Sequence, residues 1–86
     1  MQISYGRIFK KMFNKQSRQI QDKFNERLML LIKNQTHSLL NTHLLHGEWL
    51  GCKSINITGN IRAVFEEIGE NHIEFIAIGS HSELYS

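Results

Sequence analysis

The sequence predicts an α+β fold in which an N-terminal helical hairpin packs on one face of a small antiparallel sheet, in the order (β)ααβββ. Two observations lead to this prediction. Apolar residues recur with a helical period through residues 5–33, and from residue 51 onward they recur with a period of two. The 86 residues, 41% of them hydrophobic and 21% charged, suit one folded domain with one core. We therefore expect a single domain over residues 1–86.

The first predicted helix has one apolar face, and basic residues cover the rest of its surface. Its apolar positions follow an i, i+3, i+4, i+7, i+8 pattern: Tyr5, Ile8, Phe9, Met12 and Phe13. Ser17 is expected to cap a second helix, because its hydroxyl can accept a backbone N–H of the first turn. Asn34 is expected to end that helix. Residues 1–4 are interpreted as a short strand before the hairpin.

The second half of the chain is predicted to form three strands joined by tight turns. In residues 53–58 and 61–66, apolar and polar residues alternate, and Gly59-Asn60 between them is a hairpin-turn signal. Residues 72–79 are apolar in both phases, which is typical of an inner strand. Residues 34–50 have no sustained period and are expected to form an irregular connection, with Trp49 as a core anchor beneath it.

Charge is distributed unevenly along the chain. Residues 1–40 carry eight basic and two acidic side chains, a net charge of +6, whereas residues 41–86 carry two basic and six acidic ones, a net charge of −4. A basic half favours contact with a polyanion, and the competing interpretation is a solvated helix face. No apolar run approaches the ~20 residues of a membrane span. The single cysteine, Cys52, excludes an internal disulfide, fits a reducing cytoplasm and is expected to be a small buried residue.

Two stretches of the sequence together resemble the RelE/ParE superfamily of type II toxins and, within it, the YafQ-like branch. They are HLLHGEWLGCKSINITGNIRAVF, residues 43–65, and the closing IGSHSELY, residues 78–85. The positions that match the family pattern are His43, Leu45, Gly47, Trp49, Gly51, Lys53, Gly59-Asn60, Arg62 and residues 79–85. The resemblance implies a RelE-like fold and a cytoplasmic toxin held inactive by a cognate antitoxin protein. It also implies a ribosome-dependent endoribonuclease that cleaves messenger RNA in the A site.

The resemblance also suggests which residues would act. His81 matches a family histidine and is predicted to be the general acid, while His43 would be the base or a phosphate contact. Tyr85 matches a closing aromatic residue that would stack on or position a nucleobase. Metal-free RNA cleavage needs such an acid and a base near neutral pH, together with a cation for the developing phosphorane charge. Further RNA contacts are predicted at Lys10, Lys11, Lys15, Arg18, Lys53, Asn56 and Asn60.

The chain departs from the YafQ-like pattern at functional positions. Asn56 stands where the branch has a histidine, Asn60 where it has an acidic residue followed by an aromatic one, and Ala77 where it has an arginine. Arg62 or Lys53 would then supply the missing charge, and Arg62 is favoured because it leaves the apolar face of its strand. Otherwise the chain would be slower, differently specific or inactive.

The same departures leave a second function class open, a toxin that acts by binding. It would be either a gyrase-directed protein like the ParE relatives or a catalytically degenerate toxin. Of the remaining histidines, His37 and His72 are expected to be solvated, and His46 adjoins the motif. We expect no cofactor and no metal, because His43, His46 and Cys52 lack the four-ligand spacing of a structural zinc site.

Overall fold

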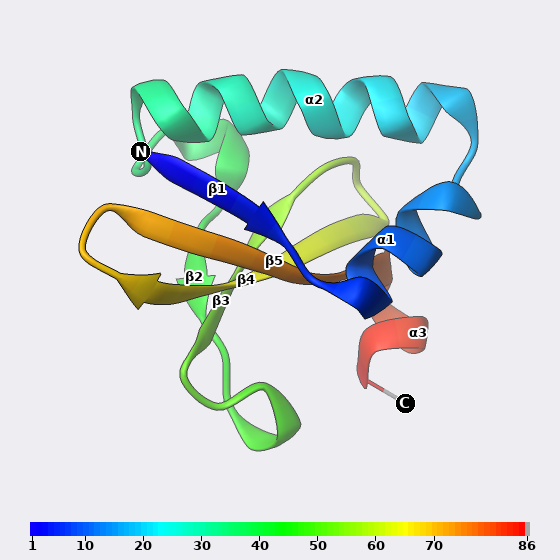
Figure 1. Cartoon of the computed structure of the whole chain (residues 1–86). Coiled ribbons are helices and arrows are strands. Elements are labelled where there is room, and N and C mark those ends of the chain that lie inside the picture. Colours follow the sequence, from blue (N-terminus) through cyan, green and yellow to red (C-terminus); the bar gives the residue numbers. More distant parts are fainter. Residues whose placement is uncertain (86) are drawn as a thin grey trace.

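The computed structural model describes residues 1–85 and places two helices on one face of a five-stranded sheet and a short helix on the other (Figure 1). The predicted α+β class is confirmed, and the predicted order is confirmed with additions. The elements are β1 (Gln2–Tyr5), α1 (Arg7–Asn14), α2 (Arg18–Lys33), a 3₁₀ turn η1 (Ser38–Leu40), β2 (His43–Leu44), a 3₁₀ turn η2 (Gly47–Trp49), β3 (Cys52–Asn56), β4 (Ile61–Gly69), β5 (His72–Ser80) and α3 (His81–Tyr85). None of the helices formed by residues 1–85 combines the length and apolar character that a membrane span requires.

The sheet is mixed, so the prediction of a purely antiparallel sheet was wrong in one respect. The strand order is β1-β5-β4-β3-β2, and β1 pairs parallel with β5 while every other pair is antiparallel. The chain leaves β1 for the two helices, re-enters the sheet at the far edge and returns by consecutive hairpins. The last of these strands therefore arrives beside β1, and it runs in the same direction.

The helical hairpin covers one face of the sheet and encloses an aromatic core. Ser17 caps α2 as predicted, since its Oγ accepts the Ile20 N–H at 3.2 Å, and α2 ends at Lys33 with Asn34 as its cap. Phe24 of α2 is 1% exposed, and the centroid of its ring lies 5.0 Å from the ring centroid of Phe75 on β5. The predicted cover of a sheet by two amphipathic helices is therefore confirmed.

A β-bulge in β5 explains why this strand is apolar in both phases. Val64 of β4 pairs with Ala77, but the next residue, Phe65, pairs with Phe75, so Ile76 is an extra residue. The bulge turns Phe75 and Ile78 toward the helices and Ala77 toward the opposite face. The predicted inner position of the strand is confirmed, because β5 pairs with β1 on one side and β4 on the other.

The two predicted hairpin turns are present, one of them longer than expected. β3 ends at Asn56, so the turn to β4 spans residues 57–60, and the Thr58 hydroxyl accepts the Ile61 N–H at 3.0 Å. The turn between β4 and β5 is made by Glu70 and Asn71, with Asn71 at a φ of 56°. The connection over residues 34–50 is mostly irregular, as predicted, but it contributes β2 and the two 3₁₀ turns.

A second, smaller core lies on the face opposite α2. It consists of Leu45, Cys52, Val64, Ala77 and Leu84, with Trp49 and, from α1, Met12 packed against it. The predictions for Cys52 and Trp49 as packing residues are confirmed. Burial, and to a lesser extent the Glu66 carboxylate, raises the pKa of the Cys52 thiol, which therefore stays protonated near neutral pH.

Candidate functional site

A cavity of about 360 Å³ opens on the face of the sheet that carries α3. Its lining comes from the connection before β3, from β4 and from α3: Asn41, His43, Leu44, Leu45, His46, Arg62, His81 and Tyr85. The structure thus brings together four of the residues singled out by sequence, namely His43, Arg62, His81 and Tyr85. A third histidine, His46, shares the cavity with them.

The imidazole of His43 is held at both of its ring nitrogens. Nδ1 lies 2.8 Å from the carbonyl oxygen of Asn41, and because a carbonyl only accepts, Nδ1 carries the proton. Nε2 lies 3.4 Å from Oγ of Ser54, a hydroxyl that is fully buried. The β2–β3 pairing sets this contact, since His43 lies directly opposite Ser54.

Arg62 is the only cation that lines the cavity within residues 1–85. Its Nη1 donates to the carbonyl oxygens of Thr58 and Gly59, at 3.0 and 3.2 Å, so the turn between β3 and β4 orients the guanidinium. Lys53 is absent from the lining, and its Nζ pairs with the Glu67 carboxylate at 2.6 Å. Of the two candidates for the missing charge, only Arg62 is in place to serve this cavity.

Asn56 and Asn60 lie near Arg62 but do not line the cavity. Asn56 faces Arg62 across the β3–β4 ladder, and its Oδ1 is buried with no hydrogen-bond partner among residues 1–85. Asn60 is exposed in the turn, and its backbone N–H donates to the Thr58 hydroxyl. Asn56 therefore has an unpaired acceptor oxygen beside β4, whereas Asn60 is part of the turn between β3 and β4.

The C-terminal helix α3 was missed by the sequence analysis, although the signal for it was present. Ser80 and Glu83 form a capping box: Glu83 Oε1 accepts the Ser80 N–H at 2.8 Å, and Ser80 Oγ accepts the Glu83 N–H at 3.2 Å. The hydrogen bond from the Ser80 backbone N–H, followed by a contribution from the Ser80 side chain, lowers the pKa of the Glu83 carboxyl, and Lys15 adds to the effect. The helix places the rings of His81 and Tyr85, i and i+4, with centroids 4.7 Å apart.

Trp49 fastens α3 to the rest of the domain. Its indole Nε1 donates to the carbonyl oxygen of Leu84 at 2.8 Å, and the Leu84 side chain is 5% exposed in the second core. Leu84 thereby anchors the C-terminal segment to the second core. His81 and Tyr85 therefore owe their positions to one hydrogen bond, one buried leucine and the capping box.

The basic residues predicted to contact RNA lie outside this cavity. Lys10 and Lys11 are in α1, Lys15 follows it, and Arg18 begins α2, where its Nε pairs with Asp22 at 3.1 Å. All four are exposed. Lys15 approaches α3, because it shares a cavity of about 350 Å³ with Glu83.

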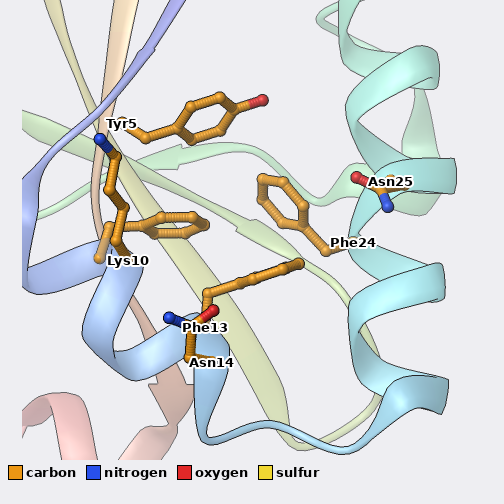
Figure 2. Close-up of a pocket in the computed structure, with 7 residues that line it drawn as sticks. Tyr5, Lys10, Phe13, Asn14, Phe24 and Asn25 are labelled. Atoms are coloured by element: carbon orange, nitrogen blue, oxygen red, sulfur yellow. The ribbon is translucent and has the colours of Figure 1, made fainter.

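A separate cavity of about 300 Å³ lies between α1 and α2, and Figure 2 shows aromatic rings facing one another across it. Its lining residues are Tyr5, Phe9, Lys10, Phe13, Asn14, Phe24 and Asn25. Burial raises the pKa of the Tyr5 phenol, and neither a histidine nor a carboxylate contributes to the lining. This cavity suits an apolar or planar group, whereas the three-histidine cavity has the groups for proton transfer.

The three-histidine cavity therefore combines exposed imidazoles, one guanidinium and one aromatic ring. Imidazoles exchange protons near neutral pH, and a guanidinium stabilises the charge that develops on a phosphate. Within residues 1–85 no group of three or more His, Cys, Asp or Glu side chains is placed to hold a metal ion.

Comparisons with known proteins place the chain among bacterial toxins. A family model described as "Bacterial toxin of type II toxin-antitoxin system, YafQ" matches residues 1–86. Among solved structures, YafQ from E. coli strain BL21(DE3) superposes with a TM-score of 0.83 at 18% identity, covering 98% of this chain and 97% of that one. The E. coli DinJ-YafQ toxin-antitoxin complex gives 0.80 at 19% identity, with 98% and 96% covered. The YoeB/ParE toxin from Agrobacterium tumefaciens gives 0.76 at 18% identity, with 94% and 99% covered. No curated protein matches the chain significantly.

Proposed function

The chain belongs to the YafQ family of type II toxins, and on that premise we propose that it is an endoribonuclease that cleaves messenger RNA in the ribosomal A site by metal-free acid–base chemistry. The observation that supports the proposal is the meeting of His43, Arg62, His81 and Tyr85 in one cavity. These residues are far apart in sequence, on β2, β4 and α3, and the fold brings them to one cavity.

The proposed chemistry divides between a proton acceptor, a cation and a proton donor. A histidine removes the proton of the 2′-hydroxyl, and the oxygen attacks the adjacent phosphorus. The guanidinium of Arg62 stabilises the charge that builds up on the phosphoryl oxygens. His81, exposed on α3, protonates the leaving 5′-oxygen, and Tyr85 beside it stacks on a nucleobase.

Arg62 takes over the charge that the family pattern places at residue 77. Ala77 is 1% exposed and belongs to the second core with Val64 and Leu84, so it contributes packing and no charge. Arg62 lines the cavity directly and is oriented by the carbonyl oxygens of Thr58, Gly59 and Ile61. Removing such a donor costs on the order of 100-fold or more in rate.

The partners in this proposal are a cognate antitoxin and the ribosome. The E. coli DinJ-YafQ and Staphylococcus aureus YoeB-YefM structures are toxin–antitoxin complexes, and we propose that an antitoxin also covers this chain. The exposed basic side chains of α1 and of the start of α2 would contact ribosomal RNA in the cytoplasm. Lys53, in an ion pair with Glu67, is a weaker candidate for an RNA contact.

The alternative function is a toxin that acts by binding, including a gyrase-directed one. The loss of titratable groups at Asn56 and Asn60 and the burial of Ala77 favour this alternative. Primer extension on translated message tests both. Cleavage within A-site codons, lost in His81→Gln and kept in the control His72→Gln outside the cavity, supports the enzyme. Growth arrest with intact message and inhibited supercoiling supports the binder.

A further inference from the structure

Three histidines line the cavity, and the structure distinguishes them by what their ring nitrogens contact. A general base must present an unshared lone pair to the proton that it removes. His81 stands beside Tyr85 on α3 and is the acid of the proposed reaction. The base is therefore to be chosen between His43 and His46.

The lone pair of His43 is directed at Ser54 of β3. Because Nδ1 donates its proton to the Asn41 carbonyl oxygen at 2.8 Å, the neutral ring carries its lone pair on Nε2. Nε2 lies 3.4 Å from the Ser54 hydroxyl, which is fully buried and has no other hydrogen-bond partner within residues 1–85. The bond is long, but it shows that Nε2 faces the sheet.

His46 has both ring nitrogens available. It lies directly before η2, its side chain is exposed, and it makes no side-chain hydrogen bond within residues 1–85. It lines the three-histidine cavity and also an adjoining cavity of about 210 Å³, and Tyr85 lines both. A nucleotide seated against Tyr85 would thus be in reach of an unengaged imidazole. The ionisable groups that share these two cavities with His46 are His43, Glu48, Arg62, His81 and Tyr85.

We infer that His46 is the general base of the proposed cleavage, and that His43 holds the loop before β2 in position. The inference rests on the proposed function. The 2′-hydroxyl proton passes to His46, the 2′-oxygen bonds to phosphorus, and the bond from phosphorus to the 5′-oxygen breaks. The leaving 5′-oxygen takes a proton from His81. The products are a 2′,3′-cyclic phosphate and a 5′-hydroxyl, nothing is oxidised or reduced, and exchange with water restores both histidines.

The first test compares pH–rate profiles of cleavage on programmed ribosomes under single-turnover conditions. His46→Gln should lower the rate by roughly 100-fold or more and remove the acidic limb of the profile, because a glutamine cannot accept the proton. His43→Gln should lower the rate less and keep the acidic limb, since its amide can still donate to Asn41. The reverse pattern, with His46→Gln at the parent rate and His43→Gln without an acidic limb, overturns the inference.

The second test does not depend on catalysis. A 2′-O-methyl tetranucleotide, which lacks the nucleophilic hydroxyl, is titrated into the protein while the imidazole Cε1–H resonances are followed by NMR. The resonances and titration midpoints of His46 and His81 should move, while those of His37 and His72 should not. If the wild type cleaves no message, the proposed activity fails, and this titration still decides whether His46 faces RNA. A shift of His81 or His43 without one of His46 overturns the inference.

Discussion

Replacing Trp49 by phenylalanine tests whether the loop before β3 holds α3 in place. The change keeps an aromatic ring against the second core and removes only the indole N–H that donates to the Leu84 carbonyl at 2.8 Å. Because α3 carries His81 and Tyr85, the expected effect is on the site rather than on the fold.

The magnitude follows from what else fastens the helix. A net hydrogen bond contributes about 0.5–1.5 kcal/mol, and an acceptor left unpaired and partly buried costs about 1–3 kcal/mol. The buried Leu84 side chain contributes about 1.5–3 kcal/mol to docking, and the capping box adds to it. Losing the indole bond therefore leaves α3 docked for most of the time but lowers its docking equilibrium by about tenfold, the equivalent of about 1.4 kcal/mol.

Amide hydrogen exchange and cleavage kinetics measure this effect separately. Exchange of the α3 amides should accelerate by about tenfold in Trp49→Phe, while amides of β4 and β5 keep their protection. The cleavage rate of Trp49→Phe at saturating substrate should fall. The control Leu50→Ala replaces an exposed residue next to Trp49 and should change neither the α3 exchange rate nor the cleavage rate.

Two results would show that the hydrogen bond from Trp49 to Leu84 does not hold α3 in place. One is unchanged α3 exchange in Trp49→Phe, which would mean that the indole bond contributes nothing. The other is uniform acceleration of exchange throughout the sheet, which would make Trp49 a general core residue rather than a fastener of α3.

Three further predictions concern the cap, the second helix and the cation. The pKa of Glu83 is lowered in the folded chain, so its stabilisation of α3 is present above the unfolded pKa and is lost as pH falls through the folded one. The protection of the α3 amides from exchange should fall as pH drops below about 4.5, and should not do so in Glu83→Gln. Ser17→Ala should lower the free energy of unfolding by about 1 kcal/mol in urea titrations. Arg62→Ala should reduce cleavage by about 100-fold, whereas Lys53→Ala should leave the rate near that of the parent.

The sequence predicted the elements whose signals are local. The apolar period and Ser17 defined α2, and the alternation of residues 61–66 indicated β4. The parallel pairing of β1 with β5 joins segments about 70 residues apart and leaves no local trace. The bulge at Ile76 was visible only as an apolar strand in both phases, which also fits a strand buried on both faces. Helix α3 has too few residues for a helical period of apolar residues to be recognised, so its only signal in the sequence was the capping box.

The resemblance to the YafQ-like toxins indicated which residues form the site, but the orientation of their side chains depends on the tertiary structure. Strand parity already favoured Arg62 over Lys53, because Arg62 alternates with Ile61 and Ala63, which belong to the helix-side core, and so leaves the apolar face of its strand. The orientation of His43 could not be predicted, since it depends on the cross-strand position of Ser54 and on the Asn41 carbonyl oxygen.

Ala77 and the docking of α3 are two consequences of one packing arrangement. Ala77 pairs with Val64 and is 1% exposed in the same cluster as Leu84, so its small side chain lets Leu84 pack directly on the sheet. An arginine at this position would have to displace Leu84 or bury an unpaired charge, which costs several kcal/mol. An arginine at residue 77 would therefore disturb the docking of α3. In the proposed cleavage the charge comes instead from a strand position that points into the cavity without crossing the second core, and within residues 1–85 Arg62 meets this condition.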